Sequence, residues 1–250
     1  MRLNPNIYIS ILVIFCAGSL YLGCATNEPP ATAEPISEVE LDFQLVYSQV
    51  FLLGGYGAGL QEFEPGQGVV WQVQGENNGT RYDNINFTAE RTLLSRQADG
   101  SSWWYLAYRP ADSTLAEYEY EFLLDDDFQV KKARYLHPTA GPQQIDLNDP
   151  QHADESIAYN DIRRTWGGTL RQISRAMTRV RIPAGLYNAE LIVYHLRAPE
   201  LENERIYRWW VNETVPGELI KFEWHERDGS ILRGEIQQIH SNRTTGIASL

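Results

Sequence analysis

Histidine is the side chain most often used as a metal ligand or general base, and the chain holds His137, His152, His195, His225 and His240. No HExxH motif occurs, and no pair has the spacing of one metal site on a helix. His195 and His225 fall in predicted strands and could meet across a sheet, but a lone histidine on a strand more often forms a surface hydrogen bond. We therefore expect no metal site, and no motif in the sequence requires a cofactor.

Two other motifs could carry chemistry, and each fits a structural role better. The run Asp125–Asp127 lacks the ligand spacing and closing Glu of an EF-hand, so it predicts a solvated hairpin turn. The glycine-rich residues 54–59 lack the Lys-Ser/Thr pair of a P-loop, so they predict a connector. No GxSxG elbow occurs, and carboxylate pairs carry no weight in a chain with 33 acids. We expect no catalytic residue and no enzyme, since an enzyme would need a cleft of converging titratable groups.

Three arginines, Arg175, Arg179 and Arg181, alternate along one run and therefore share a face of a predicted strand. The opposite face carries Ala176, Thr178, Val180 and Ile182. We expect cross-strand ion pairs on the solvent side between the arginines and the acids of another strand. Those acids are Glu117, Glu119 and Glu121. The alternative is a site for an anionic head group.

The formal net charge of -12 argues against nucleic acid as a partner, because phosphate binding needs a basic face. An anionic membrane surface would repel the same charge, so any membrane attachment must be hydrophobic or covalent. The N-terminus supplies such an attachment. Arg2 precedes an uncharged apolar run from Ile7 to Gly23, which is the pattern of a secretory signal.

The leader ends at Tyr21-Leu22-Gly23-Cys24, which resembles the lipobox of bacterial lipoproteins except for Tyr21 in the usual Leu position. The resemblance implies cleavage before Cys24 and acylation of its thiol, for example with palmitate. The alternative is an uncleaved anchor, since 17 apolar residues could nearly span a bilayer. By the same resemblance, Ala25 favours sorting to the outer membrane. Both cysteines, Cys16 and Cys24, lie in the leader, so the domain itself has no disulfide and no thiol nucleophile.

These features divide the chain into three parts. Residues 1–24 form the lipoprotein signal peptide, residues 25–40 a proline-rich and acidic tether, and residues 41–245 a single β-rich domain. At the start of the domain, residues 41–53 predict a helix that ends at the following glycines. Its expected apolar stripe contains Leu41, Leu45, Val46 and Tyr47.

From Gly66 onward the hydrophobic pattern has a period of two, which is typical of strands buried on one side. The pairs Asn78-Gly79, Asp99-Gly100 and Asp228-Gly229 predict tight hairpins. We expect about ten antiparallel strands between Gly68 and His240, in two groups, 68–147 and 168–240. A short helix is expected between the groups, from Ala153 to Ile162.

Aromatic residues recur on one face of these strands. In the run WWVNETVPGELIKFEW, Trp209 and Trp210 lie on opposite faces before the Pro216-Gly217 turn, and Phe222 and Trp224 share a face after it. Such a face must be buried, and a pocket remains if a helix covers only part of it. The candidate ligand-binding residues are Trp71, Trp104, Tyr120, Phe122, Trp209, Phe222 and Trp224.

Three segments resemble a group of bacterial exported lipoproteins with a curved antiparallel sheet. They are PGQGVVWQV (65–73), RIPAGLYNAEL (181–191) and VNETVPGELIKFEW (211–224). The group is similar to the half-barrel of LolA/LolB-type lipoprotein carriers. The resemblance implies a mainly β fold, a large curved half-barrel sheet with one or two short covering helices, whose concave face meets acyl chains.

Two functions follow as hypotheses. The first is a lipid-anchored protein of the bacterial envelope that holds an acyl chain or a lipoprotein on the concave face, attached to the membrane through Cys24. The second is a structural or assembly lipoprotein that binds an envelope protein partner through its convex face or an edge strand.

Overall fold

The computed structural model describes residues 43, 45–137, 141–149, 170–197, 204–243 and 247. The leader, Cys24, the tether and the helix predicted from Ala153 to Ile162 lie outside these residues. The described chain forms one antiparallel sheet of eleven strands, which confirms the mainly β prediction and adds one strand to the expected ten. Within the described residues, no helix is long and apolar enough to cross a membrane.

The strands fall into the two groups that the sequence predicts. The first contains β1 (Gly68–Asn77), β2 (Thr80–Arg96), β3 (Ser102–Pro110), β4 (Tyr118–Leu124), β5 (Val130–His137) and β6 (Gly141–Asp146). The second contains β7 (Leu170–Ile182), β8 (Gly185–Arg197), β9 (Glu204–Val211), β10 (Leu219–Glu226) and β11 (Ser230–His240).

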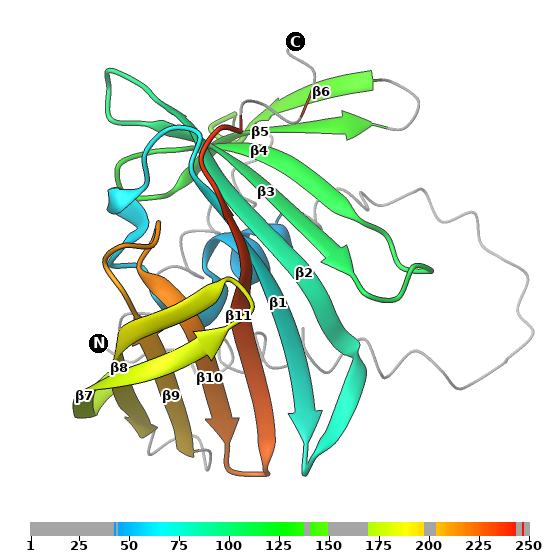
Figure 1. The fold of residues 1–250 in the computed structure, drawn as a ribbon. Coiled ribbons are helices and arrows are strands. Elements are labelled where there is room, and N and C mark those ends of the chain that lie inside the picture. The colour runs from blue at the N-terminus through cyan, green and yellow to red at the C-terminus, as the bar shows by residue number, and fades with distance from the viewer. Residues whose placement is uncertain are drawn as a thin grey trace, which may run out of the picture.

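The spatial order of the strands is β6-β5-β4-β3-β2-β1-β11-β10-β9-β8-β7 (Figure 1). Each group is therefore a meander in which sequence neighbours pair through hairpins. The first and last strands join the two meanders, with Gly68 opposite His240 and Asn77 opposite Ser230. This arrangement leaves β6 and β7 as the two edges of the sheet, so the sheet is not closed.

The predicted turn chemistry is confirmed. Asn78 and Gly79 have φ angles of 48° and 81°, as a two-residue hairpin between β1 and β2 requires. Gly100 and Gly229 each have φ of 88° in the β2–β3 and β10–β11 turns. The Asp125–Asp127 run lies in the turn between β4 and β5, where Asp125 donates its N–H to Gln129 O over 3.0 Å.

A short helical segment precedes the sheet. Phe43, Leu45 and Val46 are helical, and the segment continues as η2 (Tyr47–Phe51), η3 (Leu53–Gly55) and η4 (Leu60–Glu62). Of the predicted stripe, Val46 and Tyr47 are buried as expected, Leu45 is only half-buried, and Leu41 lies outside the described residues. The stripe consists of Phe43, Val46, Tyr47, Val50 and Phe51, which has the helical spacing of one face.

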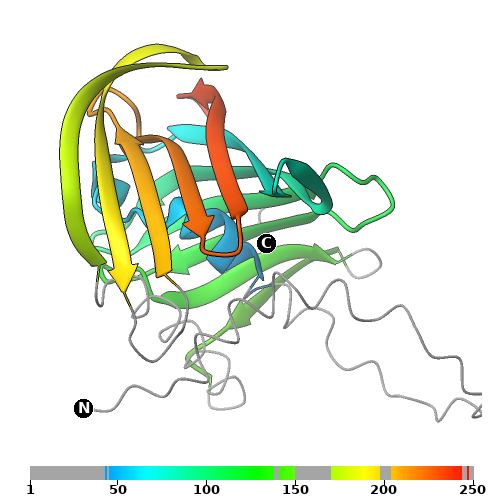
Figure 2. The same ribbon diagram turned by 90° about the horizontal axis from the view of Figure 1, so that it is seen from below.

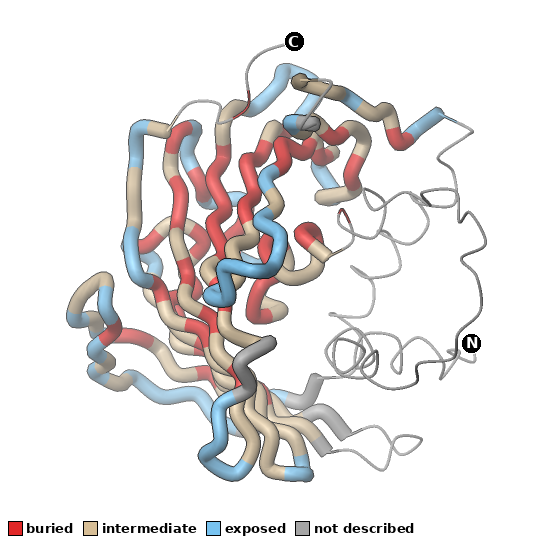
Figure 3. The backbone as a smooth tube through the Cα atoms, turned by 90° about the vertical axis from the view of Figure 1, so that its right-hand side faces the viewer, coloured by how far each residue is buried: buried red, intermediate tan, exposed pale blue. Residues whose placement is uncertain are grey.

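The sheet curves around this segment (Figure 2). We call the face that contacts residues 43–63 the concave face. Buried residues are concentrated in the middle of the strands and in the helical segment, while turns are exposed (Figure 3). The core therefore lies between the concave face and residues 43–63. These residues form the covering layer that a sheet with one apolar face requires.

Candidate functional site

The strand register places aromatic side chains in rows across the concave face. In one row, Ile192 pairs with Trp209, Trp209 with Phe222, and Phe222 with Gly234. A Cβ on Gly234 would lie 2.2 Å from Phe222 Cε1, so only glycine allows this ring to lie over β11. In the next row, Tyr194 pairs with Tyr207, Tyr207 with Trp224, and Trp224 with Leu232. Four neighbouring strands thus present a continuous apolar surface.

On the other half of the concave face, strands β1, β3 and β4 also present aromatic and apolar side chains in neighbouring positions. Trp104 lies opposite Phe122, and Leu106 lies opposite Tyr120. Trp71 lies on β1, where its ring centroid is 5.8 Å from that of Phe222. All seven predicted ligand-binding residues therefore occupy one face of the sheet, as their alternation along the chain indicates.

Most of these seven residues are covered by the chain itself. The Phe43 ring lies 4.8 Å from Tyr120 and 5.9 Å from Phe122, measured between ring centroids. Phe51 and Phe63 lie 5.2 Å and 5.1 Å from Trp104 in edge contacts. These edge-to-face pairs are favourable beyond their burial alone. This part of the concave face is consequently packed as a core.

The cover ends near Trp209 and Trp224. Both indole nitrogens donate to the carbonyl oxygen of Gly54, over 2.6 Å and 3.3 Å respectively. Trp209 is buried, whereas Trp224 and Tyr194 remain half-exposed. The aromatic surface on β8–β10 thus extends beyond the residues that cover it.

At this end of the cover, Tyr56 and Glu218 form a polar contact. The Tyr56 hydroxyl donates to Glu218 Oε2 over 2.6 Å, and its ring packs against Trp209 at 5.6 Å. Burial, together with the hydrogen bond to Glu218, raises the pKa of Tyr56. Close by, Gly59 forms a backbone bridge with Gly217, and a Cβ on Gly59 would lie 2.5 Å from Gly217 C. The glycine-rich connector is therefore docked on the β9–β10 turn.

A buried arginine is the residue that sequence reasoning missed. Arg91 is 1% exposed and lies on the concave face between Val69 and Leu106 in the strand register. Its Nη1 donates to Phe51 O over 2.9 Å, but its Nε and Nη2 have no hydrogen-bond partner among the described residues. Burial lowers the pKa of Arg91 to about 10. Its position two residues from Ala89 and Leu93, both apolar, was the available signal.

The expected pairing of Arg175, Arg179 and Arg181 with the glutamates near β4 is wrong. Arg175 pairs with Glu190 on β8. Glu117 and Glu119 pair with Arg109, and Glu121 pairs with Arg134. The reason is the strand order, because β7 and β4 lie at opposite ends of the sheet and each acid meets a cation of its own hairpin. Arg175 lies on the concave face, since it pairs with Ile192 in the row that contains Trp209. Arg179 and Arg181 are exposed at the end of β7, where the opposite side of the β7–β8 hairpin, with Ile182 and Ala189, is the buried one.

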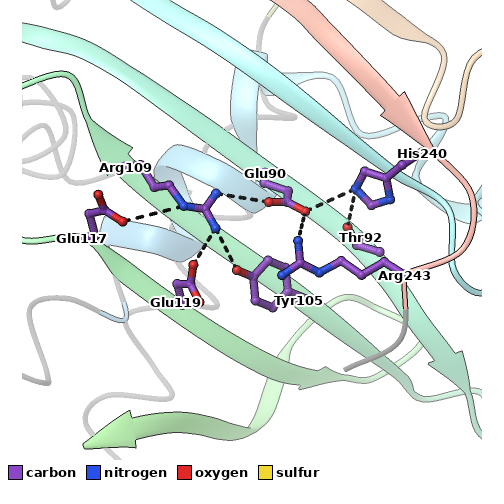
Figure 4. Close-up of polar contacts among 8 residues, drawn as sticks. All are labelled: Glu90, Thr92, Tyr105, Arg109, Glu117, Glu119, His240 and Arg243. Atoms are coloured by element: carbon purple, nitrogen blue, oxygen red, sulfur yellow. Dashed lines mark hydrogen bonds and ion pairs between the residues drawn. The ribbon is translucent and has the colours of Figure 1, made fainter. Parts of the chain in front are cut away.

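The convex face carries a polar network around Glu90, which is 5% exposed (Figure 4). Glu90 accepts from Arg109 over 3.1 Å and from Arg243, and lies 3.2 Å from His240 Nε2. The network also contains Thr92, Tyr105, Glu117 and Glu119. It ties the residues at the end of β11 to β2 and β3, so its evident role is structural.

A cleft of about 510 Å³ lies beside this network and is lined in part by Trp103, Glu121 and Arg134. The Arg134 guanidinium lies 3.8 Å from the centroid of the Trp103 ring and 3.6 Å from Glu121. Glu121 also accepts the backbone N–H of Ile247 over 3.2 Å. The charged groups of the cleft are therefore matched within the protein.

Metal ligands are not gathered anywhere in the described part of the chain, where no three His, Cys, Asp or Glu side chains could hold one ion. His195 and His225 both pair with Ile206, one on each side of β9. They are thus separated by an intervening strand, and no shared ligand site forms between them.

No protein-family model matches the chain, and no curated protein matches it in sequence. Three solved structures are similar. One is a lipoprotein from Parabacteroides distasonis, with 10% identity, a TM-score of 0.34, and coverage of 70% of this chain and 95% of that chain. An exported protein with a YmcC-like fold from Bacteroides fragilis has 6% identity, a TM-score of 0.36, and coverage of 71% and 96%. A LolA superfamily protein from Nitrosomonas europaea has 8% identity, a TM-score of 0.28, and coverage of 76% and 94%. These are the kinds of protein that the sequence resemblance indicated.

Proposed function

We propose that this protein is a lipid-anchored envelope protein that holds an apolar ligand, an acyl chain or an acylated protein, on its concave face. The function is binding rather than catalysis. The observation that carries it is the aromatic surface of β8–β10, where Trp224 and Tyr194 are only partly buried next to the buried Trp209. Partly exposed aromatic side chains at the edge of a covered apolar face are suited to contact an apolar ligand.

Residues 43–63, which cover the rest of the concave face, leave polar groups buried without hydrogen-bond partners near Arg91. This unfavourable burial supports the idea that a ligand can displace part of the covering segment. Arg91 keeps two guanidinium nitrogens buried without partners, and the buried Trp71 Nε1 also has none among the described residues. An unsatisfied buried charge costs several kcal/mol. Movement of residues 51–63 away from Arg91 would let water or a polar ligand group reach these donors.

The anchor is part of the proposal and rests on the leader. The lipobox-like Tyr21–Cys24 would supply the acylated thiol, and residues 25–40 would hold the sheet away from the bilayer. Ala25 favours the outer membrane by resemblance. In that setting, a concave face that binds acyl chains would act on lipids or lipoproteins close to the membrane.

The test uses residues 25–250, which contain every described element, and a fluorescent fatty acid. Trp224→Ala removes a half-exposed aromatic from the concave face, and we expect about tenfold weaker binding of the probe. Trp210→Ala is the matched control, because Trp210 is half-exposed on the convex side of the adjacent strand. It should change binding by less than about twofold. Native mass spectrometry should show the same probe bound to the wild-type chain.

The proposal fails if the wild-type chain carries no lipid in native spectra and does not bind the fluorescent probe. It also fails if Trp210→Ala and Trp224→Ala weaken binding equally, since the concave face would then have no special role.

The dense packing around Trp104 and Phe122 favours a second function, in which the concave face is a filled core. The protein would then be an assembly lipoprotein that binds an envelope protein through its convex face or through an edge strand such as β7. Co-purification of one envelope protein with the full-length chain, together with an absence of bound lipid, would support this alternative.

A further inference from the structure

The two edge strands of the sheet differ in how they meet solvent. β6 has only 6 residues and contains Pro142, which has no backbone N–H to donate. β7 has 13 residues and contains no proline. Its outer side pairs with no other strand of the described sheet. Because alternate residues of an antiparallel strand direct their N–H and C=O groups away from the partner, roughly half of the backbone groups of β7 face outward.

The middle of β7 is open to solvent on both faces. Residues 174–177 are all exposed, although neighbouring positions on a strand point to opposite faces of the sheet. Met177 has the largest exposed fraction among them that decides the point, 71%. Another chain can therefore approach this edge without displacing a packed side chain.

The edge is also held in a fixed position. The turn that joins β7 to β8 is bound to β11, because Ala184 donates its N–H to Ile236 O over 3.1 Å. Ile182 and Ala189, at the same end of the hairpin, are buried. An edge strand that is already extended and fixed loses little conformational entropy when another strand pairs with it.

The charge of β7 is opposite to that of the whole protein. The strand contains four arginines and no acidic residue, in a chain with a net charge of -12. Arg175 is neutralised by Glu190 on β8, with Nη2 at 2.6 Å from the carboxylate. Arg179 and Arg181 form no ion pair with any described residue, and the β8 residues opposite them are uncharged. These two exposed guanidinium groups share one face of the strand, since they are two residues apart.

This charge decides which chain can pair with β7. Charged side chains on an edge strand commonly prevent self-association, and a second β7 would bring further arginines next to Arg179 and Arg181. A strand with acidic side chains would instead form favourable cross-strand pairs with them. The short β6 with its proline is unsuited to pairing with a strand of any charge, whereas the arginines of β7 repel only basic strands.

We propose that β7 binds an extended acidic segment of a partner protein as an additional strand of the sheet. The outward N–H and C=O groups of residues 174–179 form the backbone hydrogen bonds, and alternate carboxylates of the segment pair with Arg179 and Arg181. This inference goes beyond the proposed ligand binding, because it does not depend on what the concave face holds. It specifies the edge and the partner chemistry that the protein-binding alternative leaves open.

The experiment measures binding of short fluorescent peptides to the full-length chain in nonionic detergent. In one peptide glutamate alternates with threonine, and in the other glutamine alternates with threonine. We expect the glutamate peptide to bind about tenfold more tightly to the wild-type chain. The variant Arg179→Gln/Arg181→Gln should bind both peptides alike, at the affinity of the glutamine peptide.

The control variant is Arg81→Gln/Arg227→Gln, which changes the net charge by the same amount at two exposed positions away from β7. It should keep the preference for the glutamate peptide. An equal loss of preference in both double variants would show that the total charge decides and would overturn the proposal.

A second measurement tests the backbone pairing separately from the charge. The glutamate peptide is methylated at the backbone nitrogens of all its glutamates or of all its threonines, which removes the N–H groups on one side of an extended strand at a time. Strand addition predicts that only one of these two peptides loses binding. Amide exchange should also slow at alternate positions within residues 174–179 when the unmodified peptide binds.

Three results would overturn the proposal. The first is equal binding of the two methylated peptides, which indicates attraction between charges without strand pairing. The second is equal binding of the glutamate and glutamine peptides to the wild-type chain. The third is a dimer of the wild-type chain that the glutamate peptide dissociates in sedimentation experiments, since a second copy would then occupy β7. None of these results affects the binding of the fluorescent fatty acid, so the proposed function stands or fails on its own test.

Discussion

The indole nitrogen of Trp209 donates a hydrogen bond of 2.6 Å to the carbonyl oxygen of Gly54, a residue 155 positions away in the sequence. Trp224 donates to the same oxygen over 3.3 Å. A single backbone carbonyl thus fixes where the cover ends on the concave face. Because that carbonyl has two lone pairs, it can accept from both indoles at once.

We expect Gly54→Ala to lower the free energy of unfolding by about 2–4 kcal/mol. Gly54 has φ of 73°, and a Cβ there would lie 2.7 Å from Leu219 Cδ2 and 2.9 Å from Phe222 Cδ1. Gly79→Ala is the matched control, since Gly79 has φ of 81° but no atom within 4 Å of its Cβ position. The control should cost about 1 kcal/mol. Denaturant unfolding of both variants measures the difference, and equal losses would show that Gly54 is not closely packed.

Replacement of Arg91 by Met should leave the stability unchanged or raise it by about 1–4 kcal/mol. The change removes a buried charge with two unpartnered nitrogens and keeps a long apolar side chain in an apolar row. Arg96→Met is a useful comparison, because Arg96 is exposed and donates to Gln61 O and Phe63 O over 2.8 Å and 3.1 Å. Arg96→Met should lower the stability of the protein slightly, because it removes these two hydrogen bonds. A clear loss of stability in Arg91→Met would show that the Arg91 bond to Phe51 outweighs the burial of the charge.

The stability difference between the wild type and Arg91→Met should also depend on pH. Burial lowers the pKa of Arg91 from its ordinary value to about 10 in the folded protein, so the unfolded chain binds more protons in the pH range between about 10 and that ordinary value. Stability of the wild type relative to the variant must therefore rise with pH through this window. Below pH 10 the full penalty of about 3 kcal/mol applies. Unfolding of both proteins at pH 8 and pH 11 measures the change, and a difference that does not vary with pH would contradict it.

The sequence predicts the faces of the strands well because a strand has a fixed period of two. Trp71, Phe122 and Trp224 were assigned to the apolar face from alternation alone, and their register confirms that assignment. The Asn78-Gly79 turn was equally readable, because few residue pairs adopt positive φ twice. Local rules of this kind depend on backbone geometry and survive in any tertiary context.

The features that the sequence did not predict depend on contacts between segments that are distant in the chain. The pairing of β1 with β11 brings together residues such as Val69 and Ile239, which no local pattern links. The helical stripe was predicted correctly at Val46 and Tyr47 but not at Leu45, because an apolar segment has more than one possible buried face, and only the sheet selects the one that contains Phe43. Arg91 was missed because a charged residue at an apolar position looks like an interruption of the strand, whereas here the residue is buried among apolar neighbours.

The Glu90 network on the convex face offers a comparison between a buried and an exposed carboxylate that share one cation. The Glu90 side chain is 6% exposed and the Glu117 side chain is 63% exposed, and both contact Arg109, over 3.1 Å and 3.8 Å. Glu90 also holds Arg243 and His240, which follow or end β11. Loss of its charge would therefore affect the attachment of the last strand, while loss of the Glu117 charge would not.

Glu90→Gln should destabilise the protein by about 3 kcal/mol, because two partly buried arginines lose the same carboxylate. Glu117→Gln should cost less than about 1 kcal/mol, since exposed ion pairs contribute little and are screened by salt. Hydrogen exchange should detect the first change as faster exchange in β11 and at Arg243, whose N–H donates to Gly66 O over 3.2 Å. If both variants were equally stable and exchange in β11 were unchanged, the network would not hold the end of β11. The seam between β1 and β11 would then depend on its backbone ladder alone.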